Sequence, residues 1–318
     1  MNFKNKDVIS NDTSYLRSLP NLSDEFLAMF ESFFVQTDDV KLHAVIGGNG
    51  PALLLVGGWP QTWYQWRFVM PELAKQYTVV AVDVRGFNLS DTTPSGYDSA
   101  TIANDLAKLM SILGYEKFSV VGHDLGMWAG YALAADHPER LIRLAVVEAV
   151  LPGVADWFTL LCDKPLNDFL WHFAFNRVDA INEQLVKGRE EIYFKYQFAT
   201  KAASPDAIPA YAVSYYVDLL KSSPERLRSS FEYYRVIDTN MAQNRQRKTK
   251  KITIPVLAVA GEVACNSFTA NDMRLLADDV SEVIVPACGH FVPEEAPESL
   301  LAALVPFFNP LQSEYLIK

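Results

Sequence analysis

The sequence predicts an α/β fold, in which a mostly parallel eight-stranded sheet has helices on both faces and carries an inserted helical cap. Short apolar or β-branched runs alternate with helical stretches along most of the 318 residues, which is the pattern of a sheet covered by helices. The later runs are apolar at nearly every position, as strands buried on both faces require. One long interval has aromatic-rich helical patterns and no strand-like run, which indicates a helical insertion.

The expected strands are short and bounded by turn residues. The first two, "KLHAVIGG" and "ALLLVGG", are separated by Gly-Asn-Gly-Pro and indicate an antiparallel start. The later runs are "YTVVAVDV", "FSVVG", "LIRLAVVEA", "IPVLAVAG" and "VSEVIVPA". Helical stretches lie between them, so we expect parallel pairing in this part of the sheet.

The insertion lies between two core strands, from about Leu151 to about Asn244. It includes the patterns "DFLWHFAF", "REEIYFKYQFAT" and "IPAYAVSYYVDLL". We therefore expect a first core part at 1–151, a helical cap at 152–243 and a second core part at 244–318. The basic run from Arg245 to Lys251 marks the return to the core, and we expect it to be solvated surface.

Composition limits the classes of function. Half of the residues are hydrophobic and 12% are aromatic, so the chain can bury a large core. The formal net charge of -10 disfavours nucleic acid and anionic membrane surfaces as partners, and makes acidic substrates less expected. The N-terminus has no apolar segment of the signal-peptide kind, and no run approaches 18 uncharged apolar residues, which predicts a cytoplasmic protein.

The three cysteines are Cys162, Cys265 and Cys288. They are widely spaced and form no Cys-x-x-Cys pair, so they predict neither a disulfide framework nor a zinc site. We expect small buried hydrophobic side chains at these positions, and no metal or cofactor.

The segment "VVGHDLGMWAG" has the features of a nucleophile elbow. A strand leads into Gly122-His123-Asp124-Leu125-Gly126, and a helix with small residues follows. Glycines allow the sharp turn that presents the central side chain beside a helix N-terminus, where negative charge is favoured. The chain contains no Gly-x-Ser-x-Gly that could form a rival elbow. The structural alternative for Asp124 is a helix cap.

An aspartate in this place predicts a different chemistry from that of serine. With an unperturbed pKa of about 3.9, Asp124 is an anion at neutral pH and needs no base to attack. A carboxylate can displace a leaving group from a saturated carbon and form an ester, which water can then hydrolyse. We therefore expect a two-step hydrolysis at an sp3 carbon.

The second step needs a base and an acid that orients it. His290 follows the last expected strand in "VPACGHFVPEEAPESL" and is the expected base, whereas structural roles suit His43, His123 and His137 better. Glu148 ends a wholly apolar strand, where a carboxylate is costly to bury unless it is paired. We choose Glu148 as the orienting acid, with Glu262 as the alternative.

The step also needs an oxyanion hole. The backbone amide of Leu125 is one expected donor. The amide of Trp59, in the loop "GGWPQTWYQW", is the other.

Five segments resemble a known family, from about Phe34 to the C-terminus. They are "GGWPQTWYQWRFVMPELAKQYTVVAVDVRGFNLSD", "VVGHDLGMWAGYALAADHPERL", "LWHFAF", "SFEYYRVI" and "GHFVPEEAP". They look like the α/β-hydrolase fold enzymes with an aspartate nucleophile, which include epoxide hydrolases, haloalkane dehalogenases and fluoroacetate dehalogenases. The chain is most similar to the bacterial Cif-like epoxide hydrolases. That resemblance implies a histidine and tyrosine pair in the cap, at His172 and Tyr234, with Tyr233 as the fallback.

The chain departs from the family's pattern at two places. The usual His-Gly-x-Pro motif reads Gly57-Gly58-Trp59-Pro60, so the histidine that braces the oxyanion loop is missing. The usual Gly-x-Gly reads Gly86-Phe87-Asn88, where asparagine can still tolerate a left-handed backbone.

The leaving group separates the activities within this family. An opened epoxide leaves an alkoxide, which a phenol and a second donor can protonate, as Tyr234 and His172 would; packing in the core is the alternative role for both. Halide release needs N–H donors, but Leu125 follows the nucleophile where haloalkane dehalogenases commonly have tryptophan. Phe173 follows His172 where fluoroacetate dehalogenases have tryptophan.

We therefore expect an epoxide hydrolase that forms a vicinal diol. A haloalkane or haloacid dehalogenase is the first alternative, and a non-catalytic binding protein on the same fold is the second. An apolar epoxide and water are the expected partners, and exposed aromatics in the cap would suit a homodimer. The aromatic residues expected around the substrate are Trp63, Trp128, Trp157, Phe173 and Phe175.

Overall fold

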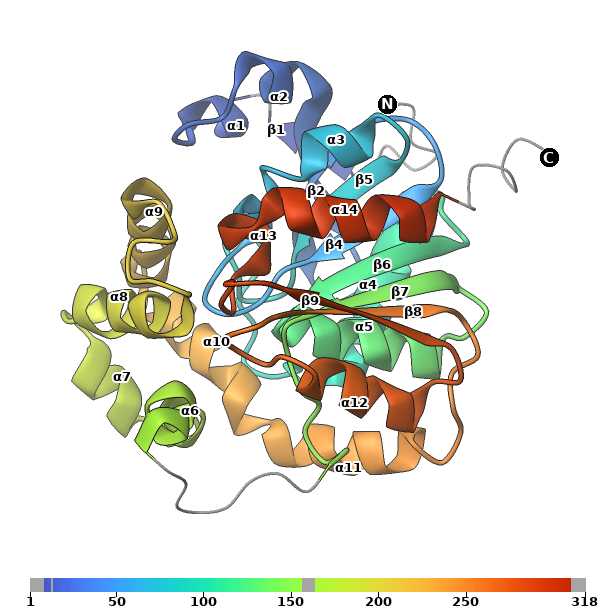
Figure 1. The fold of residues 1–318 in the computed structure, drawn as a ribbon. Coiled ribbons are helices and arrows are strands. Elements are labelled where there is room, and N and C mark those ends of the chain that lie inside the picture. Colours follow the sequence, from blue (N-terminus) through green and yellow to red (C-terminus); the bar gives the residue numbers. More distant parts are fainter. Residues whose placement is uncertain (1–8, 13, 156–163, 310–318) are drawn as a thin grey trace.

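The computed structural model describes residues 9–12, 14–155 and 164–309, which form a sheet with helices on both faces and a group of helices beside it (Figure 1). Nine described strands form the sheet in the order β1-β2-β3-β5-β4-β6-β7-β8-β9. The strands are β1 (Ile9–Asp12), β2 (Phe30–Gln36), β3 (Lys41–Gly47), β4 (Ala52–Val56), β5 (Thr78–Asp83), β6 (Phe118–His123), β7 (Leu141–Val147), β8 (Val256–Gly261) and β9 (Val280–Val285).

The sheet is mostly parallel, as the sequence predicts. Every pair from β5 across to β9 is parallel, and the pairs β1 with β2, β2 with β3 and β3 with β5 are antiparallel. The described strands number nine rather than eight, and two of them, β1 and β2, precede the seven runs named from the sequence. The first two expected runs, β3 and β4, do not pair with each other as an antiparallel start. Strand β5 lies between them, antiparallel to β3 and parallel to β4.

The core lies on both faces of the sheet, because successive side chains of a strand point to opposite sides. In β4, Leu54 belongs to one buried cluster, while Leu53 and Leu55 belong to the other. The first face is covered by α4 (Ser99–Ile112), α5 (Leu125–Asp136) and α12 (Phe268–Leu276) (Figure 1). The second is covered by α3 (Met70–Ala74), α13 (Val292–Glu295) and α14 (Pro297–Phe308).

Two short helices and a 3-10 turn complete the first part of the chain. They are α1 (Tyr15–Ser18), α2 (Asp24–Met29) and η1 (Trp63–Trp66). Among the described residues, no helix has both the length and the apolar character that crossing a membrane requires.

All the regular elements among the described residues of the inserted segment are helices, as expected. Its helices are α6 (Lys164–Asn176), α7 (Ile181–Val186), α8 (Glu190–Lys201), α9 (Ala210–Lys221), α10 (Pro224–Arg235) and α11 (Ile237–Arg247). The first five lie beside the sheet, whereas α11 packs against α4 and α5 of the core. The division at residues 151 and 243 stays a prediction.

One member of the basic run is not solvated surface. Arg247 is 9% exposed, and its Nε donates to Asp136 Oδ1 at 2.9 Å, from the end of α11 to the end of α5. The pairing with Asp136 offsets part of the cost of burying the guanidinium, so Arg247 is buried although it belongs to the basic run.

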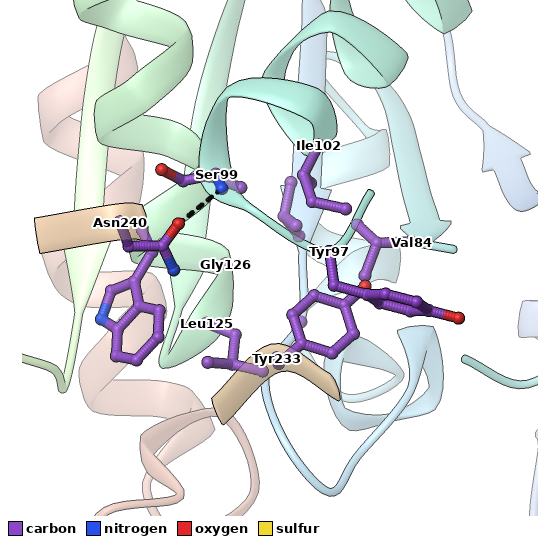
Figure 2. Close-up of a pocket in the computed structure, with 12 residues that line it drawn as sticks. Val84, Tyr97, Ser99, Ile102, Leu125, Gly126, Tyr233 and Asn240 are labelled. Carbon is purple, nitrogen blue, oxygen red and sulfur yellow. Dashed lines mark hydrogen bonds between the residues drawn. The ribbon is translucent and has the colours of Figure 1, made fainter. Parts of the chain in front are cut away.

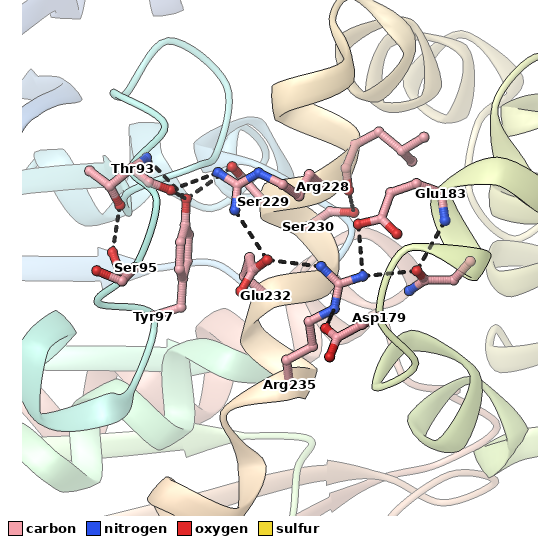
Figure 3. Close-up of polar contacts among 12 residues, drawn as sticks. Thr93, Ser95, Tyr97, Asp179, Glu183, Arg228, Ser229, Ser230, Glu232 and Arg235 are labelled. Atoms are coloured by element: carbon pink, nitrogen blue, oxygen red, sulfur yellow. Dashed lines mark hydrogen bonds and ion pairs between the residues drawn. The ribbon is translucent and has the colours of Figure 1, made fainter.

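Helix α10 is fixed on both sides by polar contacts (Figure 3). On the core side, Arg228 Nη2 donates to the carbonyl of Thr93 at 2.8 Å. On the cap side, Arg235 Nη2 donates to Glu183 Oε1 of α7 at 2.7 Å. The helix that carries Tyr234 is therefore tied to a core loop and to the cap.

Candidate active site

Asp124 occupies a sharp turn between β6 and α5. Its φ of 53° and ψ of -120° are an uncommon backbone conformation for a residue other than glycine. The flanking glycines allow close packing: a Cβ on Gly122 would lie 2.2 Å from the carbonyl oxygen of Gly126. A Cβ on Gly126 would lie 2.2 Å from the carbonyl oxygen of Val56. The backbone therefore has the form of a nucleophile elbow.

Both oxygens of the Asp124 carboxylate have partners. Oδ1 accepts a hydrogen bond from the Trp59 amide at 2.8 Å, and Oδ2 lies 3.4 Å from His290 Nε2. Burial alone would raise the pKa of Asp124, but hydrogen bonding to His290 and its charge lower that pKa below the ordinary value, and the Leu125 amide contributes. Asp124 is therefore an anion held by the two expected amides.

The loop that supplies the Trp59 amide comes very close to Asp124. A Cβ on Gly58 would lie 2.2 Å from Asp124 Cβ. At the place of the missing histidine, a Cβ on Gly57 would lie 2.5 Å from Gln65 Nε2, so a buried glutamine occupies the space beside this residue. The second departure from the family's pattern is also accommodated, because Asn88 adopts a φ of 41°.

His290 lies between two carboxylates. Its Nδ1 is 3.6 Å from Glu148 Oε1, and its Nε2 faces Asp124. Burial lowers the pKa of His290, but the hydrogen bonds and charges of Asp124 and Glu148 outweigh burial and raise it to about 9. The imidazole is thus protonated at neutral pH while Asp124 carries its charge.

Of the two acids that the sequence left open, Glu148 is the one beside the imidazole. Its side chain is fully buried, and it accepts hydrogen bonds from the amides of Gly261 at 2.7 Å and Cys265 at 2.6 Å. Glu262 is exposed and instead accepts from the amide of Ala287 at 2.8 Å. These hydrogen bonds from two backbone amides explain how an apolar strand can be followed by a buried carboxylate.

The histidine loop is held from α13. Glu295 accepts hydrogen bonds from the amides of Gly289 at 3.0 Å and Phe291 at 2.8 Å, on either side of His290. It also accepts from the Ala203 amide at 2.7 Å, just after α8. Sequence reasoning missed this positioning residue, although the second glutamate of "VPEEAP" was a visible signal.

Three other histidines, His43, His123 and His137, have hydrogen-bonded positions, which fits the structural roles expected of them. His43 Nδ1 lies 2.7 Å from Asp83 Oδ2. His123 Nε2 lies 2.8 Å from the His290 carbonyl oxygen, and burial lowers its pKa to about 3. His137 Nε2 lies 2.8 Å from Asn104 Oδ1 near the end of α5.

A cavity of about 40 Å³ lies at the Asp124 carboxylate. That volume admits a few water-sized groups. The cavity brings together expected catalytic and pocket residues, namely Asp124, Glu148, His290, His172, Trp128 and Phe173.

His172 and Tyr234 lie side by side, but only His172 lines this cavity. The His172 imidazole stacks on Trp59 with ring centres 5.4 Å apart, and burial keeps its pKa well below the ordinary value, so it is neutral. The Tyr234 ring packs edge-on against His172 at 5.5 Å and against Phe173 at 5.3 Å. Burial and the charge of Asp124 raise the pKa of Tyr234 well above its ordinary value, so the phenol keeps its proton.

Tyr233, the fallback, faces a different space. Its hydroxyl donates to the carbonyl of Arg85 at 2.6 Å, and its ring lines a second cavity of about 10 Å³ behind the elbow. Figure 2 shows this cavity, where Ser99 N donates to Asn240 Oδ1 at 2.8 Å.

Two of the expected pocket aromatics lie elsewhere. Trp63 does not line the cavity, because η1 directs it into the core cluster on the other face of the sheet, where it stacks on Phe26 at 5.9 Å. Phe175 packs within the cap against Trp171 at 5.6 Å. Trp157 falls outside the described residues, as does Cys162.

Two further residues of the cavity wall were not expected there. Cys265 is half-buried and lines the cavity rather than the core, whereas Cys288 is buried as expected. Lys201 also lines it. The sequence did contain a signal that Lys201 is buried. Phe194 and Phe198 stand four positions apart on one face of α8, and Lys201 follows three positions later on the same buried face.

Comparison with known proteins agrees with this arrangement. Residues 51–297 match the model of a family described as alpha/beta hydrolase fold. The chain is 33% identical over 300 residues to a protein named soluble epoxide hydrolase from a Corynebacterium species, covering 86% of this chain and 95% of that one. It is 42% identical over 170 residues to a fluoroacetate dehalogenase from a Burkholderia species, covering 51% of this chain and 55% of that one.

A solved structure, that of Cfl2 from Burkholderia cenocepacia, is similar in fold and sequence. The TM-score is 0.85 and the identity 34%, over 91% of this chain and 97% of that one. The chain therefore belongs to the alpha/beta hydrolase fold family and, within it, to the group that includes the soluble epoxide hydrolases.

Proposed function

We propose that the protein is an epoxide hydrolase that forms a vicinal diol through a covalent ester on Asp124. The observation that carries this proposal is the carboxylate of Asp124, which faces a cavity with the Trp59 amide at 2.8 Å and the His290 imidazole at 3.4 Å. The Corynebacterium relative named soluble epoxide hydrolase supports the substrate class.

In the first step, Asp124 attacks a carbon of the epoxide ring. The carbon–oxygen bond breaks, and its electron pair goes to the ring oxygen, which takes a proton. Tyr234 is the proposed proton donor, because its ring packs against His172 in the cavity wall and its raised pKa keeps the phenol protonated until a stronger base, the alkoxide, forms in the cavity. The neutral imidazole of His172 is the proposed second hydrogen-bond donor.

In the second step, water attacks the ester carbonyl carbon of Asp124. Ester formation removes the negative charge that helps to raise the pKa of His290, so the imidazole becomes a free base when a base is needed. His290, oriented by Glu148, takes a proton from the water. The amides of Trp59 and Leu125 stabilise the oxyanion, each contributing roughly 2.7 to 4 kcal/mol. When the intermediate collapses, the ester carbon–oxygen bond breaks and the leaving oxygen takes the proton from His290. The second water proton restores the Tyr234 phenol, Asp124 returns to the carboxylate, and the diol leaves.

A dehalogenase with the same nucleophile is the second candidate. The fluoroacetate dehalogenase relative, at 42% identity, favours it. The indole of Trp128 is not free to hold a halide, because its Nε1 donates to the carbonyl of Val150 at 2.9 Å. The buried Nε1 of Trp59 has no hydrogen-bond partner among the described residues and is the donor that a halide would use.

The test removes the base. His290→Ala is incubated with epoxides and with haloalkanes, and the intact mass is measured. We expect an adduct equal to one whole epoxide, because the ester forms but is not hydrolysed. Asp124→Ala combined with His290→Ala is the control and should add no mass.

The other candidates give different masses. A dehalogenase would gain only the alkyl group of a haloalkane or haloacid and release halide. A non-catalytic binding protein would gain no covalent mass from any of them, and that result would contradict the proposal. Turnover of the wild type in heavy-oxygen water should also label Asp124.

A further inference from the structure

Lys201 has a buried side-chain amino group, which is positively charged when protonated, in the wall of the cavity that contains Asp124. It ends α8 and is 5% exposed. Its Nζ donates to Gln197 Oε1 one turn earlier and lies 5.8 Å from the centre of the Phe169 ring, which lines the same cavity. Lysine is almost never buried to this degree without a charged partner.

The described residues do not neutralise this cation. The hydrogen bond to Gln197 is with a neutral amide, and among the described residues no ion pair within 4.0 Å includes Lys201 Nζ. Burial lowers the pKa of Lys201 to about 7, and the charge of Asp124 only partly opposes this effect. A buried ammonium with one neutral partner costs free energy that the fold does not recover.

The hydrogen-bonding capacity of the ammonium is also incomplete. An ammonium has three N–H donors, and Gln197 takes one of them. The main chain of Lys201 does have a structural task, since its carbonyl accepts from the His290 amide at 2.9 Å. Any residue could supply that carbonyl, so the charged side chain needs another reason.

We propose that Lys201 binds a carboxylate on the substrate, so that the preferred substrate is a small epoxide bearing a carboxylic acid group next to the ring. This inference rests on the proposed function and names its substrate class. A carboxylate would supply the missing counter-charge and accept the remaining N–H donors, in hydrogen bonds that are stronger than neutral ones.

The cavity fits a substrate of this kind. Trp128 and Phe173 make one part of the wall apolar, as the sequence predicts, while Lys201 adds a cation to it. The volume of about 40 Å³ suits a short molecule. The net charge of -10 disfavours acidic substrates only at long range, because salt screens exposed charges beyond about 10 Å, whereas Lys201 would contact the ligand directly.

The experiment compares glycidate with glycidamide, which have the same shape but differ in charge. We expect the wild type to prefer glycidate. Lys201→Met should lower kcat/KM for glycidate by about 10- to 100-fold, mainly through KM, and should change kcat/KM for glycidamide by less than about 3-fold. Lys201→Arg should recover part of the preference.

Lys195→Met is the matched control. Lys195 lies on the same helix, but it is exposed and its Nζ bonds to Glu191 Oε2 at 3.2 Å. This variant should leave both substrates unaffected. A measurement on the wild type alone adds an independent check: acetate should compete with glycidate, and acetamide should not.

Two results would overturn the inference. Equal losses of kcat/KM for both substrates in Lys201→Met would mean that the ammonium acts on the ring oxygen. An unchanged kcat/KM for both substrates would mean that the side chain has a structural role only. The adduct test in His290→Ala separates these results from failure of the proposed function. An adduct with glycidamide or with an apolar epoxide but no preference for glycidate would leave the epoxide hydrolase standing, whereas no adduct with any epoxide tested would refute both.

Discussion

His290 has its raised pKa because two carboxylates flank a buried imidazole. Its pKa of about 9 in the folded protein exceeds the ordinary value of 6.5. Protonated His290 therefore stabilises the fold fully below about pH 6.5, and this stabilisation is lost as the pH rises towards 9. Lys201 acts in the opposite direction: its lowered pKa destabilises the fold at low pH, and the penalty fades between about pH 7 and 10.5.

A pH series of the free energy of unfolding can isolate the contribution of His290. We expect the difference between wild type and His290→Gln to fall by about 3 kcal/mol between pH 6 and pH 9, since each pKa unit corresponds to about 1.4 kcal/mol. Urea unfolding at several pH values measures it. Because Lys201 titrates in both proteins, its opposing effect cancels in the difference. A difference that is constant with pH would show that folding does not shift the pKa of the His290 imidazole.

Sequence reasoning was most successful where a residue's chemistry and its strand position agree. Asp124, Glu148 and His290 lie together because each follows the carboxyl end of a strand, and those ends share one edge of a parallel sheet. Lys201 was missed because its position depends on how a cap helix docks. Trp63 was misplaced for a similar reason, since a loop residue's direction cannot be inferred from periodicity.

At the scale of elements, the elbow depends on backbone contacts between β4, β6 and α5. Gly126→Ala should destabilise the protein by about 3 kcal/mol or more and reduce activity strongly, because the new Cβ would meet the Val56 carbonyl oxygen at 2.2 Å. Urea unfolding and an epoxide assay measure the two effects.

The matched control lies one turn along the same helix. A Cβ on Gly130 would meet only side-chain atoms, the nearest being Leu144 Cδ1 at 3.1 Å. Gly130→Ala should therefore change stability by no more than about 1 kcal/mol, since better helix propensity offsets the tight contact. Similar losses in the two variants would mean that helix α5, rather than the elbow, is sensitive to added volume.

The regular elements were predictable to different degrees. The buried parallel strands and the cap helices follow from runs of apolar residues and from helical periodicity. β1 could not be predicted in that way, because "ISND" is a half-exposed edge strand with one apolar residue, and its pairing with β2 defines it. The pairing order of β3, β5 and β4 was also not visible, since strand order depends on contacts distant in sequence.

At the scale of the whole molecule, Arg247 joins the end of the cap insertion to the core. Its Nε bonds to Asp136 Oδ1 at 2.9 Å and its Nη1 to Ser99 Oγ at 2.9 Å. Arg247→Met should lower the free energy of unfolding by about 2 kcal/mol, because hydrogen bonds to charged groups are lost and Asp136 loses its partner. Thermal and urea unfolding measure this loss.

Arg245→Met is the control on the same helix, because Arg245 is exposed. We expect it to change stability by less than about 0.5 kcal/mol. If both variants behaved alike, the bridge between α11 and α5 would have no measurable role. The cytoplasmic location and the homodimer stay predictions, since both concern the protein's surroundings rather than its fold.

The contact between the end of α8 and the histidine loop sets a condition for engineering. The Lys201 carbonyl accepts from the His290 amide, and Glu295 bonds to amides on both segments. A Cβ on Gly289 would also lie 2.4 Å from the Ala203 nitrogen. Chimeras that borrow a cap from a relative would therefore need to keep the backbone path of residues 201–203, because a change of chain length there would displace the carbonyl and the amide that hold the His290 loop.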